Sequence, residues 1–201
     1  MDFDFIVIGA GISGAAAAHA LALLGRVLLL EAEAQPGYHS SGRSAALFTP
    51  NYGNATVRAL IAAAHPFFRA PPAGFVEPLL TRRGGIAIAG PDGRAQLEAY
   101  MAPGAADGSI REITPDEAVA AVPILRRGPI AFACREPEIF DIDVARLHQG
   151  FLSGLAARGG TLACGAPVSG LERRAGRWRV ATPAGEHAAA TIVNAAGAWA
   201  D

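Results

Sequence analysis

The sequence predicts an α/β fold, and three consecutive features near its N-terminus carry the prediction. Residues 3–8 have the apolar composition of a buried strand and run directly into the glycine-rich turn of residues 9–14. An alanine-rich helix then continues to Leu24 and Gly25, and a second apolar strand over residues 27–30 ends on Glu31. This βαβ order and spacing are typical of dinucleotide-binding domains.

Each glycine of the turn has a separate expected role. Gly9 permits the tight turn, Gly11 lets the backbone approach a pyrophosphate, and Gly14 lets the helix pack closely against the strand. The phosphates are expected at the helix N-terminus, where free N–H groups and the helix dipole favour negative charge. Glu31 is expected to accept hydrogen bonds from both hydroxyls of an adenosine ribose and to repel a 2′-phosphate.

Composition and charge exclude several other classes of protein. The net charge of −1 gives no reason to expect nucleic acid as a partner, and the chain has no lysine for a Walker A motif or a Schiff base. No apolar run reaches the roughly 18 residues that a membrane span needs, and an acidic start that enters a strand at once argues against a secretory signal. We expect a cytoplasmic protein with two reduced cysteines, and leave open a peripheral position on the inner face of a membrane.

The remaining elements alternate in type along the chain. Helices are expected over residues 54–69, with Asn54 as N-cap, over 92–101 and 115–122, and from 143 to about 158. Strands are expected over residues 77–81, 85–89, 129–135, 161–164, 168–174, 178–182, 187–191 and 191–194, the last of which leads into a small-residue turn and a new helix. Either Asp141 or Asp143 can cap the helix near 143; with no His or Cys at ligand spacing, we expect no metal site. These patterns predict a discontinuous nucleotide-binding domain of residues 1–50 and 143–201, with part of an α+β substrate-binding lobe, residues 51–142, inserted in it.

Three blocks of the sequence resemble the FAD-dependent D-amino acid oxidase superfamily, which includes glycine and sarcosine oxidases and D-amino acid dehydrogenases. They are the βαβ unit, the loop Ser40-Ser41-Gly42-Arg43-Ser44-Ala45-Ala46, and the run Val193-Asn194-Ala195-Ala196-Gly197-Ala198-Trp199. Residues 35–60 and 141–150 are more similar still to D-arginine dehydrogenase and its relatives. The resemblance implies an FAD-binding Rossmann-like domain with FAD as cofactor. It also implies a truncated chain, because family members continue for more than 150 residues, with the arginine that clamps the substrate carboxylate in the absent part; a partner chain that completes the fold is the alternative.

The resemblance also implies which residues contact the cofactor and the substrate. Arg43, Ser44, Ala45 and Ala46 would contact the flavin, and Val168 would lie by the adenine. The full set of implied cofactor contacts is Gly9, Gly11, Ile12, Ser13, Gly14, Glu31, Ala32, Ser40, Ser41, Gly42, Arg43, Ser44, Ala45, Ala46, Val168, Ala195, Ala196, Gly197 and Trp199. Thr49 and Tyr52 would face the substrate, although a capping threonine and a surface tyrosine would fit the same positions.

Two departures from the D-arginine enzymes bear on the substrate. Leu47 stands where they have a histidine, and Gly85 stands where they place a glutamate that receives a cationic side chain. A guanidinium buried without a carboxylate partner would pay a large desolvation cost, so we expect a neutral, apolar D-amino acid instead. Thr81 and Glu77 are near enough in sequence to compensate in part.

The expected reaction is oxidation of the CH–NH2 group of a D-amino acid, with hydride transfer to flavin N5 and hydrolysis of the imino acid to a 2-oxo acid and ammonia. No protein base is required, and His39 is expected to be a hydrogen-bonded loop residue rather than a base or a flavin attachment point. Three alternatives remain open: a 2-hydroxy acid or glycerol phosphate enzyme, a glycine- or sarcosine-type oxidase or dehydrogenase, and a nucleotide-binding subunit completed by another chain. The electron acceptor is not predicted.

Overall fold

The structure is a computed structural model that describes residues 2–200. The chain forms two compact units. The first contains the residues up to Ala45, the segment Pro71–Leu79 and the residues from Asp143 on, and the second contains Ala46–Ala70 and Leu80–Ile142. The boundaries expected from the sequence differ from these units at residues 46–50 and 71–79.

Residues 71–79 belong to the first unit because they pack on its helices. A Cβ atom at Gly150 would lie 2.0 Å from Cδ1 of Phe75, so the Phe75 ring occupies the space that the glycine leaves. The backbone N–H of Asp143 donates to the carbonyl of Leu79 at 2.9 Å. This packing depends on contacts distant in sequence, which a local pattern does not reveal.

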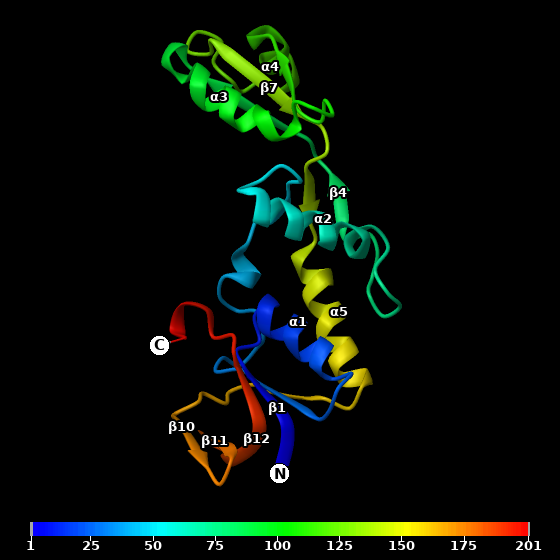
Figure 1. The fold of residues 1–201 in the computed structure, drawn as a ribbon, viewed down its shortest axis with the longest axis vertical. Coiled ribbons are helices and arrows are strands. Elements are labelled where there is room, and N and C mark those ends of the chain that lie inside the picture. The colour runs from blue at the N-terminus through cyan, green and yellow to red at the C-terminus, as the bar shows by residue number, and fades with distance from the viewer. Residues whose placement is uncertain (1, 201) are drawn as a thin grey trace. The chain divides into compact units, whose positions relative to one another are not determined.

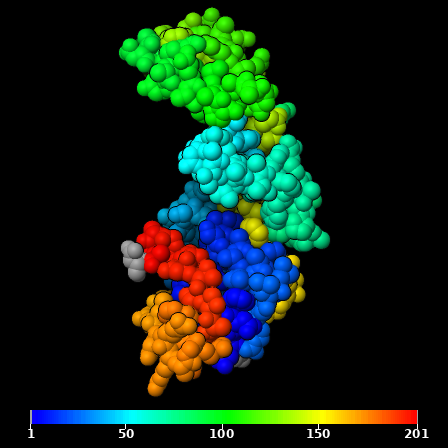
Figure 2. All heavy atoms as spheres, in the orientation of Figure 1, coloured from blue at the N-terminus to red at the C-terminus, as the bar shows by residue number. Residues whose placement is uncertain are grey.

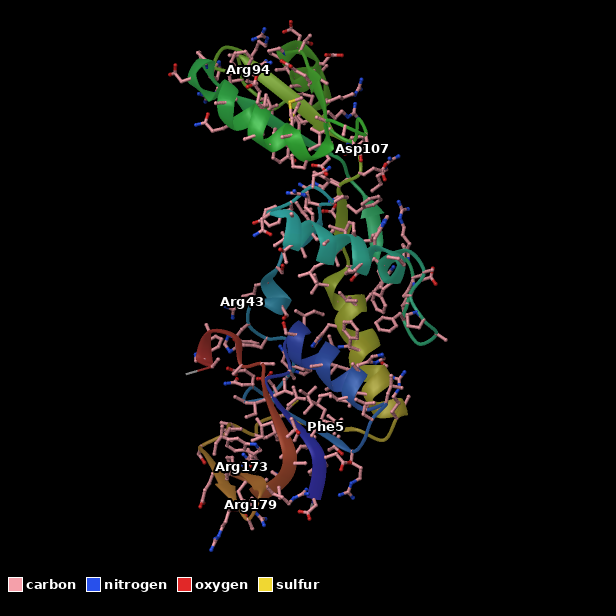
Figure 3. All side chains as sticks on the ribbon, viewed as in Figure 1. Phe5, Arg43, Arg94, Asp107, Arg173 and Arg179 are labelled. Carbon is pink, nitrogen blue, oxygen red and sulfur yellow. The ribbon has the colours of Figure 1, made fainter. Side chains whose placement is uncertain are left out.

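The first unit is built on a six-stranded sheet with the order β10-β11-β12-β1-β2-β9. Four neighbouring strands, β12, β1, β2 and β9, are parallel, and β10, β11 and β12 form an antiparallel meander. The strands are β1 (Asp2–Ile8), β2 (Val27–Leu30), β9 (Thr161–Ala163), β10 (Gly170–Arg174), β11 (Arg177–Thr182) and β12 (Gly185–Asn194). The β10–β11 hairpin, in which every residue of β10 is exposed, is orange in Figure 2 and carries Arg173 and Arg179, which Figure 3 labels.

The sequence-based division of the last strand was wrong. Residues 187–191 and 191–194 form one strand, β12, whose first half pairs with β11 and whose second half pairs with β1. Ala188 and Ala189 pair with both neighbours, so the meander and the parallel sheet are continuous. The new helix expected after Ala196 is a single 3-10 turn, η4 (Gly197–Trp199), in the described residues.

Two helices cover one face of this sheet, as Figure 1 shows: α1 (Ile12–Leu21) and α5 (Val144–Ala157). Ala18 of α1 and Leu155 of α5 are fully buried against Val7 and Leu29. Helix α1 ends at Leu21 rather than near Leu24, because the following residues form tighter turns of the i→i+3 type. The opposite face carries a second core around Ile6, Leu28 and Val180.

The second unit holds two three-stranded sheets, with the orders β3-β8-β4 and β5-β7-β6. Its strands are β3 (Leu47–Phe48), β4 (Leu80–Arg82), β5 (Gly85–Ala89), β6 (Arg111–Ile113), β7 (Phe132–Glu136) and β8 (Phe140–Ile142), and its helices are α2 (Ala55–Arg69), α3 (Arg94–Met101) and α4 (Pro115–Ala121). Two short 3-10 turns, η2 (Pro91–Gly93) and η3 (Ala102–Gly104), flank α3.

The helix starts expected near residues 54, 115 and 143 were confirmed by their capping bonds, whereas the helix expected from residue 92, α3, begins at Arg94 without a side-chain cap. The Asn54 side chain accepts from the N–H of Val57, and Thr114 and Glu117 form a complete capping box at α4. Of the two candidate caps at α5, Asp143 is the cap, and Asp141 pairs instead with Arg83 at 2.9 Å.

Three short strands were missed. β3, β6 and β8 have two or three residues each, too few for a period-two pattern to be recognised. Three expected strands begin later than expected: β4 starts at Leu80, after a loop that contains the cis Glu77–Pro78 peptide, β7 starts at Phe132 rather than at Pro129, and β10 starts at Gly170 rather than at Val168. None of the helices within residues 2–200 combines the length and the apolar character that a membrane crossing requires.

Candidate functional site

A pocket of about 760 Å³ lies in the first unit, at the carboxyl ends of β1, β2 and β12. Ligands of open α/β sheets bind at this end of the strands. Thirteen of the residues proposed from the sequence as cofactor contacts line it: Gly9, Gly11, Ile12, Ser13, Glu31, Ala32, Ser40, Ser41, Val168, Ala195, Ala196, Gly197 and Trp199.

The floor of the pocket is the glycine turn between β1 and α1. Gly9 has a φ of 96°, and a Cβ on it would lie 2.5 Å from the carbonyl oxygen of Ala195. A Cβ on Gly14 would lie 1.8 Å from the carbonyl oxygen of Gly9. The turn and the loop after β12 therefore touch backbone to backbone. Gly14 lies beneath the pocket rather than in its lining, and its role is close packing.

Glu31 lies at the end of β2 and is only 9% exposed. One carboxylate oxygen accepts from the N–H of Ala10 at 2.9 Å, and the other accepts from the N–H of Glu33 at 3.0 Å. Both donors are backbone groups, so the fold itself fixes the carboxylate at the pocket wall. Each oxygen retains acceptor capacity, which suits a pair of ribose hydroxyls.

The N-terminus of α1 has no cap from its own chain segment, since Gly11 has no side chain to donate one. Ser41 supplies the missing partner from 29 residues away: its hydroxyl oxygen accepts from the N–H of Ile12 at 2.9 Å. The hydroxyl hydrogen of Ser41 remains available to an acceptor, as do the next N–H groups of the helix. Hydroxyl, N–H groups and helix dipole together form a site for a phosphate oxygen.

The loop after β12 closes another side of the pocket. The side chain of Asn194 accepts from the N–H of Ala196 at 3.1 Å and donates to the carbonyl of Ala200 at 2.8 Å. Ala195 donates from its N–H to the carbonyl of Ile8 at 2.8 Å. These bonds fix Ala195, Ala196 and Gly197 along the glycine turn.

Aromatic side chains form a further wall. Trp199, which is 62% exposed, lies 4.4 Å from the His39 ring, centroid to centroid. His39 donates from Nε2 to Glu33 at 2.8 Å, which confirms it as a hydrogen-bonded loop residue. The guanidinium of Arg43, labelled in Figure 3, lies 5.1 Å from the ring of Tyr38, which stacks edge-on against His39.

His148 is a structural part of the site that the sequence did not identify. It lies on α5, is 6% exposed, and donates from Nε2 to the carbonyl of Ala10 at 2.9 Å. A carbonyl only accepts, so Nε2 carries the hydrogen. A Cβ on Gly37, a pocket residue, would lie 3.1 Å from the same ring. The only sequence signal is the position of this histidine on the apolar face of an amphipathic helix, which does not distinguish it from a core residue.

Other expected contacts lie outside the pocket lining. Gly42, Arg43, Ser44 and Ala45 follow Ser41 in the first unit, Gly42 and Arg43 in the 3-10 turn η1 (Ser41–Arg43). Ala46, Thr49 and Tyr52 belong to the second unit. Their roles toward the flavin and the substrate stay predictions.

The carboxylates of Glu31 and Glu33 line the pocket, whereas Cys164 lies outside the lining. Within the described chain, no three His, Cys, Asp or Glu side chains are placed to hold a metal ion. Burial and the nearby carboxylate of Glu31 raise the pKa of the Cys164 thiol, so it is less reactive as a nucleophile than an ordinary cysteine. The arrangement fits a nucleotide with two ribose hydroxyls and a diphosphate, as in the ADP part of FAD.

Comparison with known proteins bears on the same site. The chain has the fold of glycine oxidase from Geobacillus kaustophilus, with a TM-score of 0.85 and 22% identity over 99% of this chain and 56% of that one. The FAD-bound L-α-glycerophosphate oxidase from Mycoplasma pneumoniae gives a TM-score of 0.83 and 14% identity, covering 96% and 53% of the two chains. L-Proline dehydrogenase from P. horikoshii gives a TM-score of 0.82 and 22% identity, over 98% of this chain and 53% of that one.

The chain thus spans about half the length of these solved relatives. A family model described as DAO, FAD dependent oxidoreductase, matches residues 4–201, which is nearly all of the chain. The match includes the glycine turn, Glu31 and the loop after β12. The chain belongs to the DAO family of FAD-dependent oxidoreductases.

Proposed function

We propose that this chain is the FAD-binding half of an amino acid oxidoreductase that oxidises the CH–NH2 group of a neutral D-amino acid. The observation that carries the cofactor assignment is the Glu31 carboxylate, fixed by two backbone N–H groups beside the glycine turn. The family membership supports the reaction class.

Different pocket residues bind the ribose, the diphosphate and the adenine of the ADP part of FAD. Glu31 receives the ribose hydroxyls, and the first N–H groups of α1 with the Ser41 hydroxyl receive the diphosphate. Val168 lies by the adenine. The residues proposed to contact the flavin ring are Arg43, Ser44, Ala45 and Ala46. Backbone donors suit this task because their positions cost no side-chain ordering when the ligand binds.

The bound flavin supplies the hydride acceptor, which no side chain could replace. The protein contributes orientation of the substrate and exclusion of water. Thr49 and Tyr52 are the proposed substrate contacts in this chain; Thr49 is partly buried, and Tyr52 is 67% exposed and available to a ligand. No general base is assigned, since a neutral amine can lose its Cα hydrogen as hydride without one.

The preference for a neutral side chain is supported by the surroundings of Gly85. A Cβ there would lie 2.4 Å from Cδ1 of Ile139, so an apolar side chain occupies the space where a glutamate side chain would begin. Leu47, on β3, is 46% exposed and likewise offers apolar surface. Neither position provides a charge to offset the desolvation of a guanidinium.

A second candidate is oxidation of a hydroxyl-bearing substrate. It is favoured by the likeness to L-α-glycerophosphate oxidase, which shares the fold over 96% of this chain. The products distinguish the two functions, because oxidation of an amine releases ammonia after hydrolysis and oxidation of an alcohol does not. A third possibility, a subunit completed by another chain, predicts that FAD binds to this chain and that turnover begins only when the other chain is added.

The test begins with the spectrum of the purified chain. A bound flavin gives an absorption band near about 450 nm. In the whole oxidoreductase of which this chain is proposed to be the FAD-binding half, D-leucine, D-phenylalanine and D-methionine, added without oxygen, are expected to bleach the band faster than D-arginine. The 2-oxo acid and ammonia are then measured. A colourless protein that takes up no FAD contradicts the cofactor assignment. A preference for D-arginine contradicts the proposal that the absence of a carboxylate at Gly85 favours a neutral substrate.

A further inference from the structure

We propose that Glu136 is a positioning residue, which fixes the Thr49–Tyr52 turn of the second unit through the side chain of Asn51. Its importance for substrate binding rests on the proposed function, because that function places Thr49 and Tyr52 at the substrate. The order of the turn itself does not depend on that function.

Glu136, at the end of β7, is 1% exposed. One of its oxygens accepts from the amide nitrogen of Asn51 at 2.8 Å, and the other accepts from the hydroxyl of Tyr100 at 2.7 Å. Asn51 also donates to the hydroxyl oxygen of Ser109 at 3.1 Å. The network joins β7, helix α3, the 49–52 turn and the loop before β6, which Figure 3 marks at Asp107.

Both partners of the carboxylate are neutral, and no ion pair among the described residues includes Glu136. A buried carboxylate without a cation is costly, and an apolar side chain of similar volume would be the more stabilising choice. Burial and the bond to Glu136 raise the pKa of Tyr100, so its hydroxyl stays a donor through the neutral range. The group is therefore better explained by what it positions than by stability.

The positioned element is a β-turn. The N–H of Tyr52 donates to the carbonyl of Thr49 at 3.1 Å, with Pro50 and Asn51 as the two central residues. Proline favours the first central position, but nothing in the turn itself anchors its tip to the rest of the unit. Asn51 is that tip, and its amide is held by Glu136 and Ser109. A change at Glu136 therefore reaches Tyr52, the next residue in the chain, through a single side chain.

Chymotrypsin cleavage after Tyr52, followed by mass spectrometry of the released peptide, measures opening of this turn in the whole chain. Glu136→Met removes both acceptors at nearly constant volume, and Asn51→Ala removes the donor. Each is expected to raise the cleavage rate about tenfold or more, as loss of a hydrogen bond to a charged group implies. Glu136→Gln keeps one acceptor for Asn51 and is expected to remain within about threefold of the original rate.

Two controls separate positioning from a general loss of stability. Glu112→Met changes a half-exposed carboxylate of the same unit, and trypsin cleavage at Arg126 reports on the unit away from the turn. Glu112→Met is expected to leave the rate of cleavage after Tyr52 unchanged. Glu136→Met and Asn51→Ala are expected to leave the rate of cleavage at Arg126 unchanged. The double variant is expected to open no faster than Asn51→Ala alone, since that change already removes both bonds that hold the turn.

Equal cleavage after Tyr52 in the original chain and in Asn51→Ala overturns the proposal, and so do additive effects in the double variant. If Glu136→Met does not fold, Asn51→Ala and Glu136→Gln still decide the question, because both leave the buried site filled. The assay contains no FAD. A protein that binds no FAD would contradict the proposed function but not the role of Glu136. Unchanged cleavage after Tyr52 would contradict the role of Glu136 but not the proposed function.

Discussion

The two units of the chain each bury a glutamate, and they hold it with different kinds of donor. Glu31, in the first unit, accepts from two backbone N–H groups, whereas Glu136, in the second, accepts from the side chains of Asn51 and Tyr100. Backbone donors are fixed by strand and turn, so Glu31 is set by the fold and retains acceptor capacity toward a pocket. Side-chain donors come from separate segments, so Glu136 ties those segments together and has no exposed surface left for a ligand.

This difference predicts which kinds of substitution destabilise each unit. The first unit should respond most strongly to changes that move its backbone, and the second to changes that remove a single side chain.

Gly14→Ala tests the dependence of the first unit on its backbone. The new Cβ would lie 1.8 Å from the carbonyl oxygen of Gly9, and neither backbone can yield easily. We expect a loss of about 3 kcal/mol or more in the free energy of unfolding, measured by urea denaturation. Gly128→Ala is the matched control, because a Cβ there meets nothing within 4 Å, and its effect should stay within about 1 kcal/mol. Similar effects of the two changes would contradict the close packing of turn and helix.

Glu31→Gln tests whether the first glutamate serves a ligand. The amide loses one acceptor and no longer repels a negative charge. ADP-ribose should bind about tenfold more weakly, and its advantage over the 2′-phosphorylated form should shrink by a similar factor. Calorimetry measures both affinities, with the exposed Glu172→Gln as control. An unchanged preference would mean that Glu31 does not face the ribose.

Tyr100 tests the second glutamate through pH. The pKa of its hydroxyl is raised by burial and by the bond to Glu136, so the folded chain holds the proton more tightly than the unfolded chain does. The unfolded chain then loses its proton first, and stability should fall as pH rises above 10.0. Comparing urea midpoints at about pH 9 and about pH 11, we expect a smaller fall in Tyr100→Phe than in the original chain. Equal falls would show that burial and the bond to Glu136 do not raise the pKa of Tyr100 in the folded chain.

Ser41→Ala and Thr114→Ala compare a distant cap with a local one. Each removes the hydroxyl that accepts from a first-turn N–H group, at α1 and at α4 respectively. Each is expected to cost about 1 kcal/mol in thermal or urea unfolding. Saturating FAD should widen the gap for Ser41→Ala alone, because only that hydroxyl is proposed to contact the diphosphate. The same widening for Thr114→Ala would contradict the placement of the cofactor.

The sequence alone predicted more of the pocket residues of the first unit than of the side-chain network of the second unit. Gly9, Gly11 and Glu31 are close in sequence to the elements that position them, and their spacing is enough to place them together. Ser41 was found through its loop, although its bond to Ile12 could not be foreseen across 29 residues. Trp199 was among the expected cofactor contacts, but neither His148 nor the contact between the His39 and Trp199 rings was predicted, because these groups meet only after the helix and the last strand have packed.

In the second unit, the helix starts at Asn54 and Thr114 were correct because caps are local. The network around Glu136 was missed because its members are separated by up to 85 residues and none of them forms a recognisable motif. Strands β3, β6 and β8 were missed for the same reason, since their pairing and not their composition defines them.

The most direct test of the account is an NMR titration of the isotope-labelled chain with ADP. We predict that amide shifts change at Gly9, Gly11, Ser13 and Gly14 in the turn and at Ala195–Gly197 after β12, while Asn51 and Glu136 of the second unit keep theirs. Changes centred on the second unit, or no change in the glycine turn at saturating ADP, would contradict the assignment of this pocket to the ADP part of FAD.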